Sequence, residues 1–377
     1  MTRFGFVSTY PPTRCGLATF TAALAAELTT GLADTATIVR VMDGPDPDGR
    51  LTSERGPVSA VVLPGRRDTV AAAIAVLNTC DVAIVQHEYG IYGGRDGDEI
   101  VALLERLSVP VIVVLHTVLA APTASQREVL RAVCAASTSV VVMSDNAAAV
   151  LRSVYRVDES KVSMIPHGVP SQTARPAHTG TGARRVVTWG LISAGKGLEW
   201  GIRAVGLLRE RGIPVEYVIS GQTHPKVLEH EGERYRRGLE RLVAELGLED
   251  IVTLDDRYLD ASQLAEFVAS ADVVLLPYMS TEQATSGVLA EAVAAGIPVV
   301  ATRFPHAVEL LSGGAGLIVD HSDAESMAEA VRSILMSDET GRAMRDAALR
   351  DSQLATWPVV AHRYRLLAAS LAAVEAA

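Results

Sequence analysis

The sequence predicts an α/β protein with two doubly wound domains, each a parallel sheet covered by helices on both faces. Short apolar runs alternate with helical segments along nearly the whole chain, which indicates parallel strands joined by right-handed crossovers. The expected strands are rich in Val and Ile with little polar alternation, as in sheets that are buried on both faces. The chain of 377 residues is also longer than one core usually serves.

The first half of the chain alternates regularly until a polar segment interrupts it. Strands are expected at 4–8, 35–42, 60–63, 82–86, 111–115, 139–143 and 162–165, and helices at 17–28, 68–78, 99–107, 125–136 and 146–155. Residues 170–182 (PSQTARPAHTGTG) are polar, contain Pro and Gly and lack apolar periodicity, which is typical of a linker. We therefore expect a first domain at 1–170 and a linker at 171–182.

The second half repeats the pattern. Strands are expected at 185–188, 215–220, 251–254, 273–276, 298–301 and 316–319, and helices at 198–211, 231–246, 261–269, 288–295, 322–336, 338–352 and 359–374. We expect a second domain at 183–356, followed by a last helical segment at 357–377.

Composition disfavours several classes of function. The net charge of −10 argues against nucleic acid or an anionic membrane as the main partner. Cys15, Cys80 and Cys134 are far apart and form no CxxC, so we expect reduced thiols and no metal knuckle. No apolar run approaches the ~20 residues of a membrane span, and the N-terminus does not resemble a signal peptide. We expect a cytoplasmic protein without a transmembrane segment; peripheral membrane contact and oligomeric state stay open.

The sequence also lacks the usual signatures of a metal site. There is no HExxH, no GxSxG and no cluster of His and carboxylates at metal spacing. The acidic loop at 43–50 (DGPDPDGR) could suggest calcium, but prolines interrupt it and it has no ligand at the twelfth position. We favour a surface loop there and expect no metal.

The segment at 273–302 (VVLLPYMSTEQATSGVLAEAVAAGIPVVAT) organises the candidate site. It is expected to form a strand, a polar loop, a helix and a second strand. A loop that leads into a helix presents unpaired N–H groups and the positive end of the helix dipole, so it binds phosphate without lysine. Lys196, between two glycines before another helix, either neutralises a diphosphate or is an exposed turn residue.

Loops in the first half hold further candidates. Gly16 begins a helix, where it either allows close approach of an anion or is a simple helix-start glycine. His87, Glu88 and Tyr89 open a glycine-hinged loop that also contains Gly94, and functional residues concentrate on such loops.

Two histidines that follow expected strands are more ambiguous. His116 comes after five apolar residues and is either functional or a satisfied core histidine, and His167 is a weaker candidate of the same kind.

On these residues the chain resembles the GT-B glycosyltransferases of family 4, retaining enzymes that use nucleotide-sugar donors. The family signature has two glutamates separated by seven residues, then an Ala/Gly-rich helix and a PVV strand, and residues 291–300 (EAVAAGIPVV) match its second half. The resemblance implies that Glu291 holds the ribose hydroxyls. Gln283 stands at the first acid position, which leaves it a hydrogen-bonding role to the donor sugar.

The resemblance implies further donor contacts. Lys196 matches the lysine that grips the diphosphate, while Leu191 replaces the arginine of the family. The glycine pair that precedes the family glutamate matched by Glu309 reads Pro305-His306 here. The other implied donor contacts are Gly16 in the first loop, His116 near the donor sugar, Arg257 and Tyr258 at the nucleobase, and Thr285, Ser286, Gly287 and Val288 at the diphosphate.

The implied activity is transfer of a mannose- or glucose-type hexose from a UDP- or GDP-linked sugar to a hydroxyl of a glycan, lipid or small molecule. Metal and cofactor are not expected. The acceptor is expected on the first domain near His87, Glu88, Tyr89 and Gly94, and the family's last segment crosses back to that domain. The alternatives are a GT-B sugar-nucleotide epimerase and, less favoured, a non-catalytic sugar-binding protein. A nicotinamide-dependent oxidoreductase is weaker still, because neither first strand precedes a glycine fingerprint.

Overall fold

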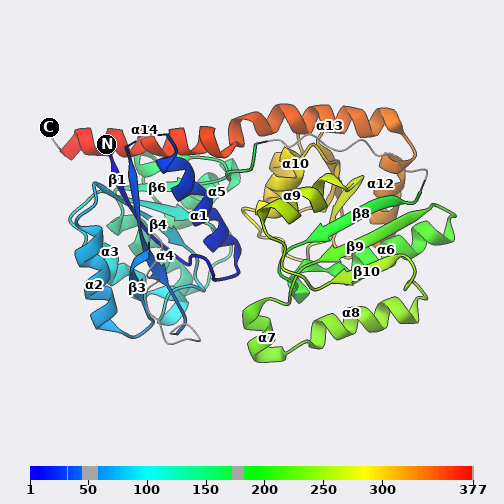
Figure 1. Ribbon diagram of the computed structural model, residues 1–377, viewed down its shortest axis with the longest axis horizontal. Coiled ribbons are helices and arrows are strands. Elements are labelled where there is room, and N and C mark those ends of the chain that lie inside the picture. The colour runs from blue at the N-terminus through cyan, green and yellow to red at the C-terminus, as the bar shows by residue number, and fades with distance from the viewer. Residues whose placement is uncertain (32, 45–57, 172–181, 376–377) are drawn as a thin grey trace. The chain divides into compact units, whose positions relative to one another are not determined.

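The computed structural model describes residues 1–31, 33–44, 58–171 and 182–375, which form two compact units (Figure 1). Unit 1 comprises Met1–Gly168 and Trp357–Ala377, and unit 2 comprises Val169–Thr356. Most of the expected linker at 171–182 and of the acidic loop at 43–50 lies outside the described residues.

Unit 1 contains a seven-stranded parallel sheet in the order β3-β2-β1-β4-β5-β6-β7. Its strands are β1 (Arg3–Ser8), β2 (Thr35–Val41), β3 (Val58–Val62), β4 (Val82–His87), β5 (Val111–Leu115), β6 (Ser139–Val142) and β7 (Val162–Met164). Phe4 on β1 pairs with Ala36 on one side and with Val82 on the other. The strand order reverses between β1 and β4, and doubly wound sheets bind ligands beside such a reversal.

Helices complete unit 1. They are α1 (Gly16–Thr29), α2 (Arg67–Leu77), α3 (Glu99–Leu104), α4 (Ala124–Ala136), α5 (Asp145–Val150) and α14 (Trp357–Glu375), with short helical turns at Arg95–Gly97, Leu151–Tyr155 and Glu159–Lys161. Arg365 on α14 donates to the carbonyls of Glu27 and Leu28, at 2.8 and 2.7 Å, where α1 ends. Tyr364 is fully buried beside them, so the last helix is part of this core.

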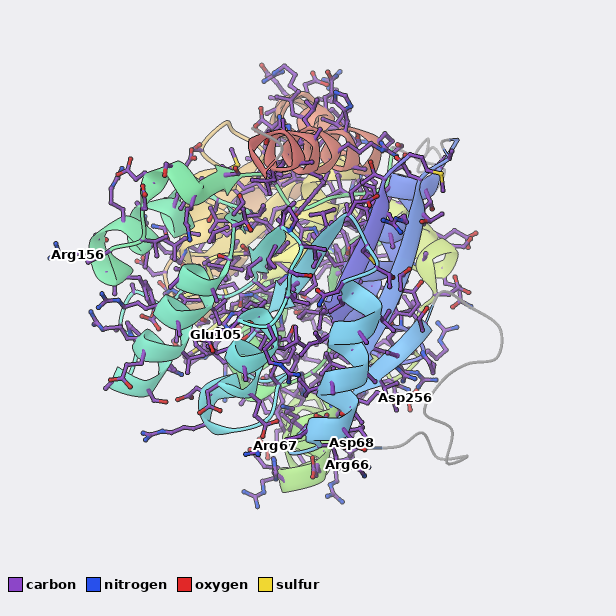
Figure 2. All side chains as sticks on the ribbon, turned by 90° about the vertical axis from the view of Figure 1, so that its left-hand side faces the viewer. Arg66, Arg67, Asp68, Glu105, Arg156 and Asp256 are labelled. Atoms are coloured by element: carbon purple, nitrogen blue, oxygen red, sulfur yellow. The ribbon has the colours of Figure 1, made fainter. Side chains whose placement is uncertain are left out.

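The outer surface of unit 1 carries solvated ion pairs. Arg66 and Asp68 pair at 2.7 Å at the start of α2, and both side chains are exposed (Figure 2). Such pairs contribute little to stability, and we assign this one no further role.

Unit 2 contains a six-stranded parallel sheet in the order β10-β9-β8-β11-β12-β13. Its strands are β8 (Arg184–Trp189), β9 (Val215–Ser220), β10 (Val252–Asp255), β11 (Val273–Leu276), β12 (Val299–Thr302) and β13 (Gly316–Val319). Its helices are α6 (Leu198–Glu210), α7 (Pro225–Glu231), α8 (Arg234–Glu245), α9 (Ala261–Ala269), α10 (Gly287–Ala294), α11 (Pro305–Leu310), α12 (Ala324–Leu335) and α13 (Asp338–Ser352), with a turn at Ala194–Lys196. Here the strand order reverses between β8 and β11.

Both faces of this second sheet are buried. Val186 and Leu275 pack with α6, α8 and α12, whereas their neighbours Val187 and Leu276 pack with α9 and α10 on the opposite face. Successive strand residues point to opposite faces, so continuous apolar runs are needed to cover both. The predicted fold class is therefore confirmed.

Some predicted boundaries were wrong. The helix expected at 231–246 begins only at Arg234 as α8, because Gly232, with a positive φ of 61°, ends α7 just before it, and α7 itself was not expected. Helix α11 was missed. His87 and Trp189 were placed in loops but end β4 and β8. No helix in the described ranges has the length and apolar character needed to cross a bilayer.

Candidate functional site

In unit 2 the loop after β8 is pressed against the end of β11. Gly197 has a positive φ of 57°, and a Cβ there would lie 2.2 Å from the Pro277 carbonyl oxygen. The Met279 amide donates to the Gly195 carbonyl at 3.0 Å. Lys196 is thereby fixed in the loop, with its Nζ 4.0 Å from the centroid of the Tyr278 ring. The ring face holds the cation by electrostatic attraction.

The loop before α10 is bonded to itself and to α11. Gln283 Nε2 donates to the Thr285 carbonyl at 2.7 Å. Ser286 caps the helix, because its Oγ accepts from the Leu289 amide at 3.2 Å. The Ser286 amide donates to His306 Nδ1 at 2.9 Å.

These hydrogen bonds reduce the number of backbone amides that are available to bind the expected anion. Ser286 was expected to offer its amide to a diphosphate, but in this structure His306 accepts that N–H. Among the residues that the structure describes, the Gly287 and Val288 amides at the helix start have no recorded partner. These two N–H groups therefore remain to bind an anion.

Glu291 lies one turn further along α10. Its Oε2 accepts a 3.1 Å hydrogen bond from Nε1 of Trp189, the last residue of β8. Burial raises the pKa of Glu291 to about 7, and the bond from Trp189 opposes this rise. The site thus presents a carboxyl that is about half ionised at neutral pH, beside the reversal between β8 and β11.

Arg257 and Tyr258 follow β10, at the edge of the same sheet. The Arg257 guanidinium contacts both oxygens of Asp255, with Nη2 at 2.7 Å from Oδ2, and this hydrogen bonding lowers the pKa of Asp255. The side chains of Arg257 and Tyr258 are exposed, and Tyr258 is 41% exposed. An exposed aromatic ring beside a fixed cation can stack on a base.

His224 was missed by the sequence reasoning. Its amide donates to the Ile192 carbonyl at 2.9 Å, and the Ile192 amide donates to Gln222, so the two loops run side by side. Burial, followed by the charges of Lys226 and Lys196, lowers the pKa of His224. No local pattern could have found it, because its neighbours come from a distant loop.

In unit 1 the predicted acceptor residues gather where β4 and β5 end. Thr117 Oγ1 donates to Glu88 Oε2 at 2.5 Å, and the Tyr89 amide donates to Oε1 of the same carboxylate at 2.9 Å. His116 Nε2 lies 2.7 Å from Gln86 Oε1. The Glu88 carboxylate is therefore held in one orientation by two hydrogen bonds.

Three histidines near this edge are kept neutral. Burial, helped by the neighbouring His167 and His87, lowers the pKa of His116 to about 3. Burial also lowers the pKa values of His87 and His167 to about 4. His87 is fully buried, and neither ring nitrogen has a partner within the described part of the chain. The His87 side chain is thus not accessible for its predicted contact with an acceptor.

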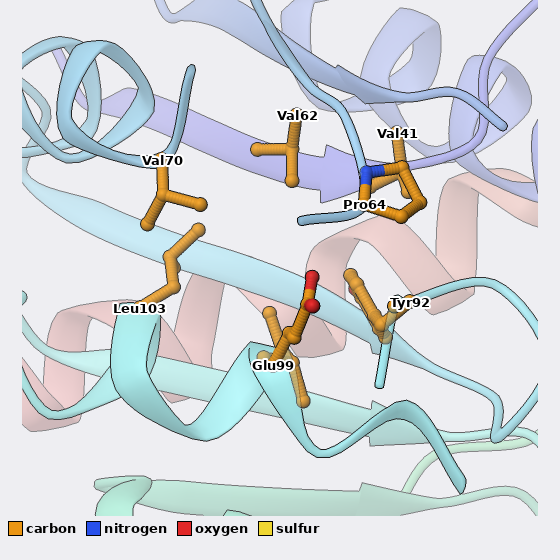
Figure 3. Close-up of a pocket in the computed structure, with 9 residues that line it drawn as sticks. Val41, Val62, Pro64, Val70, Tyr92, Glu99 and Leu103 are labelled. Carbon is orange, nitrogen blue, oxygen red and sulfur yellow. The ribbon is translucent and has the colours of Figure 1, made fainter. Parts of the chain in front are cut away.

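Gly16 begins α1, and a Cβ added there would meet nothing within 4 Å, so the approach to this helix start is open. Gly94 instead lies in a packed turn with φ 80°, where an added Cβ would lie 1.8 Å from Asp98 Oδ1. A small pocket under this turn is lined by apolar side chains and by Glu99, which Figure 3 shows pointing toward Pro64. Glu99 Oε2 already accepts from the Gly65 amide at 2.9 Å. The residues that line the pocket therefore support the turn.

Two family models match the chain, one to each half. The model described as "Glycosyltransferase Family 4" matches residues 16–173, and that described as "Glycosyl transferases group 1" matches residues 183–337. The chain belongs to the family 4, group 1 glycosyltransferases. It is therefore an enzyme of the transferase class.

One curated relative matches part of this glycosyltransferase. It is the D-inositol 3-phosphate glycosyltransferase of Corynebacterium urealyticum, 32% identical over 162 residues, which are 41% of this chain. The match spans only 36% of that relative's length.

Solved structures resemble the whole chain. Anabaena HepE, solved in complex with UDP and glucose, superposes with a TM-score of 0.75 at 16% identity, covering 98% of this chain and all of HepE. Sucrose-phosphate synthase from Thermosynechococcus elongatus gives a TM-score of 0.78 at 18% identity, covering 99% of this chain and 100% of the synthase. At these identities the likeness shows the fold, which is GT-B.

Within the described ranges, no three His, Cys, Asp or Glu side chains gather closely enough to bind a metal ion.

Proposed function

We propose that this glycosyltransferase transfers a mannose- or glucose-type hexose from a UDP- or GDP-linked sugar to an acceptor hydroxyl, with retention at the anomeric carbon. The observation that carries the proposal is the grouping of a carboxyl and two helix-start amides on α10. Glu291 is fixed by Trp189, and the Gly287 and Val288 amides lie one turn earlier. These groups fit ribose hydroxyls and a diphosphate, respectively.

The similar proteins support a nucleotide donor and a polyol acceptor. HepE was solved with UDP-glucose, and the curated relative acts on an inositol phosphate according to its name.

Departure of the nucleoside diphosphate is the step that the protein must assist. Negative charge develops on the leaving oxygens, and preorganised donors aimed at that charge stabilise the transition state. Lys196 can leave the Tyr278 ring to meet it, and the Gly287 and Val288 amides add the dipole of α10. The proposal needs no metal and no cofactor.

The sugar end of the donor site in unit 2 is assigned to Gln283, and His116 is proposed separately as a neutral hydrogen-bonding group of unit 1. The amide of Gln283 gives its N–H to Thr285, which leaves Oε1 to accept from a sugar hydroxyl. His116 stays neutral because its pKa is about 3, so it hydrogen-bonds without adding charge.

The acceptor end is assigned to Glu88 and Tyr89 in unit 1, whereas Gly94 shapes the packed turn that follows them. The Glu88 carboxylate is held by Thr117 and by the Tyr89 amide, so it can orient an acceptor hydroxyl without reorganising. A glycan, a lipid or a small polyol would satisfy these contacts.

The test is product analysis with UDP- and GDP-linked glucose and mannose and a panel of polyol, glycan and lipid acceptors. We expect release of the nucleoside diphosphate with a glycosylated product whose anomeric proton couplings show retention. An inverted product would refute the stereochemistry. Free epimerised sugar without glycosylated product would instead indicate an epimerase. Binding of a sugar without its nucleotide, and no release from any donor, would indicate a sugar-binding protein.

A further inference from the structure

His306 contacts the loop before α10 at two points, although twenty residues separate it from Ser286. Its Nδ1 accepts the Ser286 amide at 2.9 Å, and its own amide donates to the Gln283 carbonyl at 3.3 Å. The side chain is only 5% exposed. The ring and the backbone amide of this one buried residue thus bond the two ends of a four-residue loop, which fixes the loop's shape.

The imidazole must act as an acceptor at Nδ1, because a backbone amide can only donate. The neutral ring therefore carries its proton on Nε2.

The loop closes with a third bond. Gln283 Nε2 donates to the Thr285 carbonyl at 2.7 Å. A glutamate at this position would place a carboxylate oxygen against that carbonyl oxygen, and two acceptors repel. The amide at 283 and the histidine at 306 thus support one loop conformation together.

We propose that His306 is a positioning residue, which holds the loop from Gln283 to Ser286 in its donor-binding shape before any donor arrives. Its ring acts through Ser286 on the adjacent Gly287 and Val288 amides, and its backbone amide supports Gln283 at the sugar end. This inference rests on the proposed function, because the donor site it organises is the one assigned there. Preorganisation of this kind lowers the ordering cost of binding.

Two substitutions separate the hydrogen bond from the space that the ring fills. His306→Ala removes the acceptor, whereas His306→Asn retains one, because Asn Oδ1 occupies nearly the position of Nδ1. Ser337→Ala is the matched control: it removes another side-chain acceptor from a helix start in unit 2, where Ser337 Oγ accepts from the Thr340 amide at 3.2 Å.

The first measurement is amide hydrogen exchange of the full-length protein without nucleotide. In His306→Ala, peptides covering 283–289 should exchange roughly tenfold faster than in the wild type, as expected for loss of one hydrogen bond. His306→Asn and Ser337→Ala should exchange at the wild-type rate there. Unchanged exchange in His306→Ala, or equal acceleration in His306→Asn, would overturn the inference.

The second measurement compares calorimetric affinities for UDP and uridine, and for GDP and guanosine. The diphosphate raises affinity over that of the nucleoside, and in His306→Ala this gain should be about tenfold smaller than in the wild type. The affinity of His306→Ala for the nucleosides, and all affinities of the Ser337→Ala control, should equal those of the wild type. An unchanged diphosphate increment would show that His306 is merely structural. If the wild type binds no nucleotide, the proposed function fails together with the donor-positioning role, and the exchange data then show separately whether His306 holds the loop.

Discussion

Trp189 and Glu291 join the end of β8 to α10 through a single hydrogen bond, from the indole Nε1 to Oε2 at 3.1 Å. The bond fixes the carboxyl beside the reversal of the strand order. Burial raises the pKa of this carboxyl to about 7, so its charge changes within the physiological range. Two predictions follow from that value.

Donor affinity should rise with pH in the wild type. Ribose hydroxyls donate to the ionised carboxylate better than to the protonated acid, and with a pKa of about 7 the ionised fraction rises about tenfold between pH 6 and pH 8. Calorimetric dissociation constants for the preferred nucleoside diphosphate should fall by up to about tenfold over this range. Glu291→Gln should bind weakly at every pH, and an equal pH dependence in that variant would refute the assignment.

The same carboxyl should lower stability at alkaline pH. Because its folded pKa lies above the ordinary 4.5, the native state binds more protons than the unfolded state between pH ~4.5 and ~7, so this contribution to stability falls as pH rises. At pH 8, Glu291→Gln should therefore unfold about 2–4 °C higher than the wild type, corresponding to roughly 1 kcal/mol. A lower Tm for the variant at pH 8 would contradict this.

Gly197 should tolerate no side chain. Its φ of 57° and the Pro277 oxygen 2.2 Å from an added Cβ both oppose substitution. Gly197→Ala should cost about 2–4 kcal/mol in urea unfolding and displace Lys196. Gly195→Ala is the matched control, because a Cβ there meets nothing within 4 Å, and it should cost less than about 0.5 kcal/mol. Equal losses in both variants would refute the packing argument.

Unit 1 should lose stability in mild acid. His87, His116 and His167 have folded pKa values of about 4, 3 and 4, below the ordinary 6.5, so the unfolded state takes up protons first as pH falls. Their stabilising contribution is present above pH ~6.5 and is lost progressively toward pH ~4. Urea unfolding should show a free energy that falls by at least about 1 kcal/mol per pH unit between pH 6 and 5. A flat profile there would contradict the burial of neutral histidines.

The fold was predictable because strand and helix periods alternate without ambiguity. What the sequence could not show was contact between distant segments. His306 bonds Ser286 across twenty residues, and Trp189 reaches Glu291 on α10 from the end of β8, so no local spacing reveals either pair. His87 was misplaced because the glycine-rich loop that follows it suggested exposure, whereas the strand runs one residue further and buries it. Helix α8 starts three residues later than expected, because the backbone of Gly232 ends the unpredicted helix α7 just before it, and the long charged pattern concealed this stop.

In the proposed function, the α10 region of unit 2 binds a nucleoside diphosphate sugar. The most direct test is a thermal-shift screen of the wild type and Lys196→Ala against UDP, GDP, ADP and their sugars. A ligand at 100 times its dissociation constant stabilises the folded state by about 2.7 kcal/mol, which is easily measured. We predict a clear shift with UDP or GDP and their sugars, and a much smaller one in Lys196→Ala. If no nucleotide raises the Tm of the wild type, the donor site assigned here is wrong.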